Sequence, residues 1–119
     1  MATTLDDIRS EIVKFVYDVD QNEKVQKLIR KWNTRILFWG RDISAGFVVE
    51  VNGGNVRLIG ETNNVDEGKV KVVSDSDTLK RMFRGKENLA HLYLDGIIET
   101  YGSEKDQIVL DAVARLLWK

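Results

Sequence analysis

The only histidine of the chain, His91, is the side chain best suited to acid–base chemistry. It lies two residues before Tyr93 in the stretch ENLAHLYLD, and the chain has no cysteine that could act as a nucleophile beside it. A serine triad needs a serine placed by the fold, and the sequence contains no GxSxG or equivalent motif. We therefore expect no catalytic residue and no enzyme activity, and keep a hydrolase built on His91 and a serine as an alternative.

Metal and phosphate chemistry also lack their usual motifs. There is no HExxH pair and no EF-hand loop, and the absence of cysteine removes thiolate ligands. The stretch GETNNVDEG, residues 60–68, lacks the Gly-Lys-Ser/Thr ending of a phosphate-binding loop. We predict no metal site and no cofactor, and we interpret residues 61–69 as a loop.

Composition limits the classes of partner. Lys and Arg number 18 against 19 Asp and Glu, so the net charge of -1 favours no nucleic-acid partner. No apolar run approaches the ~20 residues of a membrane-spanning helix, and the start MATTLDDIRSE does not resemble a signal peptide. We expect a cytoplasmic protein without stable membrane insertion, a monomer or weak dimer. Its 119 residues fit one domain, residues 1–119, with helices in 1–33 and the sheet and its covering helices in 34–119.

The first third of the chain has helical periodicity. Thr4 and Asp7 form a capping-box pattern, and apolar residues then recur on one helical stripe at Leu5, Ile8, Ile12, Phe15, Val16 and Val19. After the tripeptide DQN, a second helical pattern places Val25, Leu28, Ile29 and Trp32 on one face. Two helices are thus expected before the first strand.

From TRILFWG onward the apolar period changes to two. The stretch GFVVEVNGGNVRLIGE predicts a hairpin, because Asn52, Gly53 and Gly54 tolerate the positive φ of a tight turn. A fourth run, KVKVV, alternates Val70 and Val72 with lysines. These patterns predict four half-buried strands.

The last third predicts two short helices, one strand and a final helix. Ser74 or Asp75 can cap a helix that ends near Gly85, and a second short helix follows at residues 89–93. Residues 97–101 alternate as a fifth strand, and Ser103 with Asp106 marks the start of the last helix.

That final helix is apolar on nearly every side, since Asp111 and Arg115 are the only charges between Gln107 and Trp118. It must be covered on more than one side. If it leaves the space above the sheet partly unfilled, the result is a dry cavity that accepts an alkyl chain. Simple close packing of the helix on the sheet is the other possibility.

With residues 69–118 in view, the order of signals resembles the sterol carrier protein 2 family of lipid-binding domains. The matching stretches are KVKVV, SDSDTLKRMFRG, ENLAHLYLDG, GIIETYGS and the closing apolar helix, with glycines 85, 96 and 102 at the family's positions. Two helices and the meander RILFWGRD, AGFVVEVNGG and NVRLIGE extend the resemblance to residues 20–118. The ending LLWK differs from a peroxisomal SKL-like tripeptide.

The resemblance implies an α/β (α+β) fold, in which helices cover a five-stranded mixed sheet around an internal hydrophobic tunnel. It implies the noncatalytic binding or transfer of a lipid or other hydrophobic small molecule, such as a fatty acid, fatty acyl-CoA or sterol-like amphiphile. The lining expected for the tunnel is Leu79, Met82, Phe83, Leu92, Tyr93, Ile108, Val109, Ala112, Val113 and Leu116.

Two further sets of side chains have more than one interpretation. Lys80, Arg81, Arg84 and Lys86 could form a basic rim for lipid head groups, or only the solvated face of an amphipathic helix. The three tryptophans, at 32, 39 and 118, could contact a ligand or partner, or simply fill the core. The alternative function is an accessory or interaction domain that presents substrate to, or docks on, a lipid-metabolising enzyme.

Overall fold

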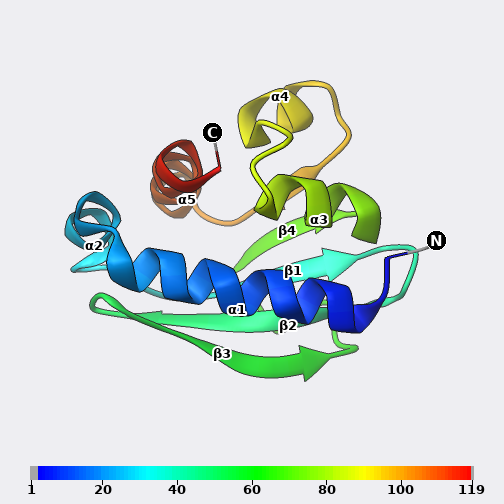
Figure 1. Cartoon of the computed structure of the whole chain (residues 1–119), viewed down its shortest axis with the longest axis horizontal. Helices are drawn as coiled ribbons and strands as arrows, with labels where there is room; N and C mark the ends of the chain where they lie inside the picture. Colours follow the sequence, from blue (N-terminus) through cyan, green and yellow to red (C-terminus); the bar gives the residue numbers. More distant parts are fainter. Residues whose placement is uncertain (1–2, 119) are drawn as a thin grey trace.

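The computed structural model describes residues 3–118, which form five helices and five strands (Figure 1). In chain order these are α1 (Leu5–Gln21), α2 (Glu23–Ile29), β1 (Asn33–Gly40), β2 (Ala45–Asn52), β3 (Asn55–Thr62), β4 (Val70–Ser74), α3 (Ser76–Phe83), α4 (Leu89–Leu94), β5 (Glu99–Tyr101) and α5 (Glu104–Leu117).

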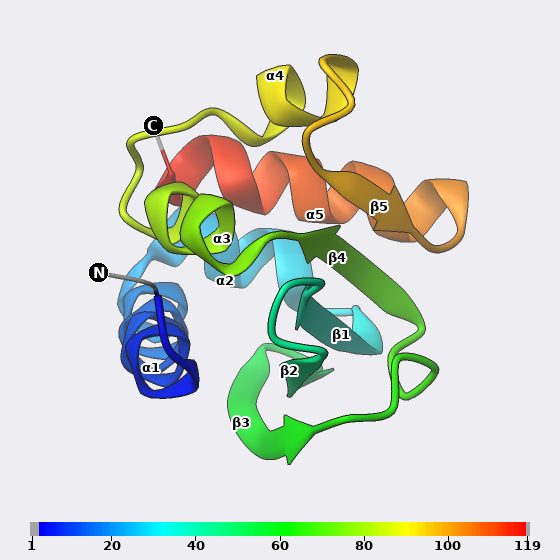
Figure 2. The same cartoon turned by 90° about the vertical axis from the view of Figure 1, so that its right-hand side faces the viewer.

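The strands form one mixed sheet in the order β3-β2-β1-β4-β5. Strand β4 runs parallel to β1, and the other neighbouring pairs are antiparallel. The helices lie over one face, as the view in Figure 2 shows with α1 beside the strands and α3 and α5 above them. The predicted fold class, helices over a five-stranded mixed sheet, is confirmed.

The main core lies between that face and the helices. Strand β1 contributes Ile36 and Phe38, which are fully buried together with residues from all five helices. The intervening Leu37 and Trp39 point to the opposite face, where they form a small second cluster with Val48 and Val73. Trp39 therefore packs against the back of the sheet, away from the helices.

The loop before β4 closes over this back face and needs a glycine to do so. A Cβ atom at Gly68 would lie 2.6 Å from the Cβ of Leu37 and 2.8 Å from its amide nitrogen. No side chain fits there without moving the backbone. Residues 61 and 62 of the predicted loop belong to the end of β3, and the rest of the loop passes over Leu37.

Local sequence signals place the helix starts and the hairpin where they were expected. The Thr4 side chain accepts from the Asp7 amide and the Asp7 side chain accepts from the Thr4 amide, which completes the capping box. Asp75, one of the two predicted caps, accepts from the Thr78 amide at 2.8 Å. Between β2 and β3, Gly53 and Gly54 have φ values of 56° and 97°, as the turn requires.

Two elements are shorter than their apolar patterns suggested. Helix α2 ends at Ile29, so Trp32 follows it in a turn and Leu28 remains exposed. Strand β5 begins at Glu99 because the amides of residues 97 and 98 both donate to the Leu92 carbonyl, at 2.9 and 3.1 Å. These amides complete the end of α4 and are not available for strand pairing.

The β1–β2 turn is tied to the start of α3 by Asp42. Its two carboxylate oxygens accept from the amide and the hydroxyl of Ser76, at 2.7 and 2.6 Å. Burial alone would raise the pKa of Asp42, but the two hydrogen bonds from Ser76, together with those from the backbone amides of Asp42 and Ile43, outweigh it and lower the pKa below its ordinary value. Ser76 itself is buried, so these bonds satisfy groups that water does not reach.

Replacing Asp42 by alanine is expected to lower the free energy of unfolding by about 1–3 kcal/mol, because the Ser76 amide and hydroxyl lose their acceptor. Urea denaturation of both proteins measures this. The control is Asp95→Ala, an exposed aspartate at the end of α4, which should change stability by less than about 0.5 kcal/mol. Equal effects of the two substitutions would contradict the role of Asp42.

The same pair of proteins tests the pKa. The pKa of Asp42 is lower in the folded state than in the unfolded chain. Its carboxylate therefore stabilises the folded state at any pH above the ordinary pKa, and this contribution is lost as the pH falls through the lowered pKa. The stability difference between wild type and Asp42→Ala should therefore be full at about pH 7 and smaller at about pH 3. If the stability difference between the two proteins instead grows as the pH is lowered, the pKa of Asp42 is not lowered by folding.

Candidate functional site

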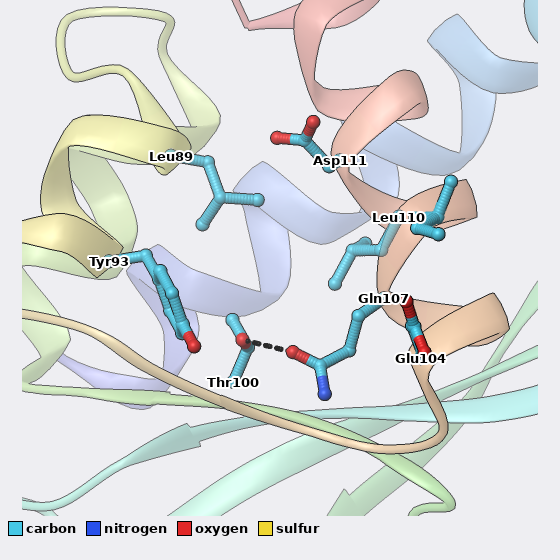
Figure 3. Close-up of a pocket in the computed structure, with 8 residues that line it drawn as sticks. Leu89, Tyr93, Thr100, Glu104, Gln107, Leu110 and Asp111 are labelled. Atoms are coloured by element: carbon cyan, nitrogen blue, oxygen red, sulfur yellow. Dashed lines mark hydrogen bonds between the residues drawn. The ribbon is translucent and has the colours of Figure 1, made fainter.

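A pocket of about 400 Å³ lies between α4, β5 and α5 (Figure 3). Its lining comes from all three elements: Leu89, Tyr93, Thr100, Glu104, Gln107, Ile108, Leu110 and Asp111. Small-molecule sites usually measure about 300–1,000 Å³. The pocket is therefore large enough to hold part of an organic ligand.

The inner boundary of the pocket is α5, which is held at both ends. Near its first turn, the indole Nε1 of buried Trp32 donates to the Asp106 carboxylate at 2.8 Å. At its far end Trp118 is 4% exposed, and its ring lies 5.2 Å from the ring of Phe15 and 5.3 Å from that of Phe83. These contacts fix α5 above the sheet, and one stripe of its side chains, which includes Gln107, Ile108 and Asp111, borders the pocket.

The outer boundary is α4, a helix of only six residues. The Asn88 side chain caps it by accepting from the His91 amide at 3.2 Å. Leu89 and Leu92 are buried beneath it, and Leu89 and Tyr93, one turn apart, face the pocket. In Figure 3 both side chains extend from α4 toward α5.

One end of the pocket is closed by β5. Thr100 pairs across from Val72, whose side chain belongs to the main core, so Thr100 faces the helices. Its hydroxyl donates to the Gln107 side-chain oxygen at 2.9 Å, the bond drawn in Figure 3. The Gln107 amide nitrogen in turn donates to the Gly102 carbonyl at 2.9 Å. This short chain of hydrogen bonds joins β5 to α5.

The chemical character of the pocket is apolar with acidic edges. Leucine, isoleucine and tyrosine side chains form about half of the lining, while Glu104 and Asp111 are its charged members. Asp111 forms an ion pair with Arg115 one turn further on, at 3.0 Å, on the surface of α5. None of the eight lining residues is a lysine, arginine or histidine.

The ten residues predicted to line a tunnel occupy two kinds of position. Tyr93 and Ile108 line the pocket and are 51% and 63% exposed. The other eight pack in the core or at its edge: Leu79, Met82, Phe83, Leu92 and Val113 are buried, and Val109, Ala112 and Leu116 are partly buried. Seven of these eight belong to the main core or pack against it, and the same core holds the aromatic cluster of Phe15, Phe38, Phe83 and Trp118.

The four basic residues predicted as a head-group rim lie outside the lining of the pocket. Arg84 pairs with Glu11 of α1 at 2.8 Å, and Arg81 contacts both Asp77 and Glu87. These ion pairs join α3 to α1 and to the loop before α4. Lys80 lies on α3, and Lys86 in the loop that follows it.

Six lining residues were absent from the predicted set: Leu89, Thr100, Glu104, Gln107, Leu110 and Asp111. A usable signal existed on α5, because Glu104, Ile108 and Asp111 recur at spacings of four and three, which places them on one helical stripe. That stripe mixes apolar and acidic residues, so a search for apolar residues alone misses it.

Other chemistry finds little support in the described residues. His91 is exposed on α4 and does not line the pocket. Within residues 3–118, no three His, Cys, Asp or Glu side chains are grouped so that they could hold a metal ion. In the same part of the chain, none of the helices has the length and apolar character needed to cross a membrane.

Comparisons with known proteins identify the fold. No family model and no curated protein matches the sequence. Among solved structures, a crystal structure of sterol carrier protein 2 superposes with a TM-score of 0.69 at 11% identity, over 98% of this chain and 96% of that one. At this level of identity the match concerns the fold.

Two further solved structures agree. The palmitated SCP2L2 from Aedes aegypti matches with a TM-score of 0.64 at 17% identity, over 96% of this chain and 95% of its own. The ubiquinone synthesis protein UbiJ-SCP2 matches with a TM-score of 0.64 at 14% identity, over 88% and 93%. The chain therefore has a sterol carrier protein 2-like fold, as its sequence resemblance predicted.

Alanine variants can distinguish the buried residues of the predicted lining from the exposed ones, because they change the free energy of unfolding by different amounts. Met82 is fully buried in the core, so Met82→Ala should lower the free energy of unfolding by about 2–5 kcal/mol. Ile108→Ala removes a largely exposed side chain and should change it by less than about 0.5 kcal/mol. Denaturant unfolding measures both, and a small effect at Met82 would mean that this side chain borders empty space.

Proposed function

We propose that this chain binds the hydrocarbon part of a lipid or similar amphiphile in the pocket between α4, β5 and α5, without chemical conversion of the ligand. The observation that carries the proposal is the pocket itself, which has apolar walls and lies under the last helix of a sterol carrier protein 2-like fold. One protein of that fold was solved in a palmitated form, which supports an acyl-type guest.

Burial of hydrocarbon supplies the affinity. Each CH₂ group transferred from water contributes about 0.8 kcal/mol, so eight of them would contribute roughly 6 kcal/mol before ordering costs are subtracted. Leu89 and Leu110 offer the buried contacts for such a chain, and Tyr93 and Ile108 shield it from solvent. Few polar contacts are needed for binding of this kind.

The lining offers no obvious reactive group. It contains no serine, cysteine, histidine or lysine. Its aliphatic hydroxyl, on Thr100, donates to the side-chain amide oxygen of Gln107, which is not a base. This supports a binding or carrier role in preference to catalysis.

In this proposal, the residues predicted to line a tunnel form the inner wall of the ligand site. Leu92 lies under α4 and is almost fully buried, and Met82 and Val113 lie deeper in the same core. A longer chain would reach them if α4 moves outward, because the buried side chains of Leu89 and Leu92 lie beneath that helix. The pocket then serves as the entrance to the predicted tunnel.

The second candidate function is an accessory domain that presents a bound lipid to an enzyme or docks on one. A specific feature favours it: apolar side chains near the pocket are exposed, with Leu94 77% and Ile97 43% exposed. The similar fold of a ubiquinone synthesis protein also supports such a role. Copurification of an enzyme that is lost in a Leu94→Ser variant would distinguish it from a solitary carrier.

Filling the pocket should abolish binding. Thr100→Phe places a ring in the pocket from a strand position that tolerates aromatic residues, so displacement of the neutral dye Nile red by decanol should weaken by about tenfold or more. The matched control is Thr62→Phe on the other edge strand, because the Thr62 hydroxyl also donates to a side-chain oxygen, that of Glu67.

Both variants must first show a cooperative unfolding transition, so that loss of structure is not mistaken for loss of binding. Wild-type affinity in a folded Thr100→Phe protein would place the ligand elsewhere. Failure of the wild type to bind Nile red or decanol up to their solubility limits would remove the proposal.

A further inference from the structure

The polar atoms available to a ligand in this pocket are mainly acceptors. The Gln107 side chain uses its oxygen for Thr100 and its nitrogen for the Gly102 carbonyl. The Thr100 hydroxyl donates its hydrogen bond to Gln107, so its oxygen can only accept from a ligand. The remaining groups are the Tyr93 hydroxyl, which can donate or accept, and the carboxylates of Glu104 and Asp111, which act only as acceptors when they are ionised.

The charges at the pocket have one sign. The lining contains two acidic side chains, Glu104 and Asp111, and no basic side chain. Asp111 shares its charge with Arg115 on the outer surface of α5, where the arginine is 69% exposed. Within residues 3–118, Glu104 takes part in no ion pair. In Figure 3 the Asp111 carboxylate points into the space between α5 and Leu89.

The N-terminal end of α5 could itself attract an anion, because the first turn of a helix carries partial positive charge. Here that turn already carries two carboxylates, Glu104 and Asp106. Asp106 is held by the Trp32 indole, and the Ser103 hydroxyl accepts from the Asp106 amide. The local field of the helix end is thus offset by side chains of the same helix.

Two of the four basic residues predicted to bind a head group already have ion-pair partners elsewhere. Arg81 and Arg84 are paired with Asp77, Glu87 and Glu11 around α3. Moving either of them to the pocket would break ion pairs that join α3 to its neighbours. An anionic head group at this site would meet the carboxylates of Glu104 and Asp111, and the neighbouring cation, Arg115, already pairs with Asp111.

From this arrangement we infer that the pocket selects amphiphiles by the charge of the polar end, and that its preferred ligand carries a hydrogen-bond donor without negative charge, a protonated amine above an alcohol and both above a carboxylate. The inference rests on the proposed function, since it names the ligand class of the same pocket. Apolar contacts set the affinity common to the series, and Glu104 and Asp111 set the order within it.

The test compares three ligands of one chain length, decylamine, decanol and decanoate, as competitors of Nile red. Decylamine is expected to bind about tenfold more tightly than decanoate, with decanol between them. Raising the ionic strength should narrow the spread, because exposed charges are screened within a Debye length of about 8–10 Å. The decanol affinity should change little with salt.

The double variant Glu104→Gln/Asp111→Asn should bring the amine and carboxylate affinities within about threefold of each other. The matched control, Glu23→Gln/Asp20→Asn, changes the net charge equally, and Glu23 is the first residue of its helix just as Glu104 is. This control should keep the wild-type order. It separates a local effect from the overall charge of the protein.

The outcomes separate the two proposals. If none of the three ligands competes, the proposed lipid-binding function fails. If all compete but decanoate binds as tightly as decylamine, or the double variant keeps the wild-type ratio, lipid binding stands and the charge selection is wrong.

Discussion

Helix α5 is fixed above the sheet at two points, and the rest of the site depends on this. The Trp32 indole holds the first turn through Asp106, and Trp118 anchors the last turn against the rings of Phe15 and Phe83. Both anchors come from parts of the chain distant in sequence, the end of α2 and the α1–β1–α3 interface. With its ends fixed, α5 cannot settle onto the short helix α4, and the space between them remains a pocket.

The same arrangement separates two tasks within one small domain. Stability comes from the aromatic cluster, from buried aliphatic residues such as Met82 and Val113, and from polar ties such as Asp42 to Ser76. Ligand contact belongs to side chains at the edge of this core. Helix α4 covers the pocket, but it is only six residues long and packs on the core through two buried leucines. Binding of a longer ligand would therefore depend on movement of α4.

Much of the fold followed from local patterns, since capping residues, strand alternation and the Gly53–Gly54 turn each act within a few residues of the chain. The candidate site was harder. Helix α5 is apolar on nearly every side, so its periodicity carried little information on which stripe faces the sheet, and Ile108 and Val113 were predicted to lie together. The anchors at Trp32 and Trp118 help to set the rotation of the helix, and both are long-range contacts. Likewise, the pairing of Arg84 with Glu11 joins residues 73 positions apart, so no local pattern predicts it.

The central claim is that hydrocarbon enters between α4, β5 and α5. Methyl-resolved NMR of the protein titrated with decanol tests it most directly, because methyl groups report the apolar surfaces that a guest touches. The account predicts the largest shifts at Leu89, Ile108 and Leu110, with no change at Leu37 and Val48 behind the sheet. Shifts centred on Leu37 and Val48, or saturation of binding without change at the three pocket residues, would contradict it.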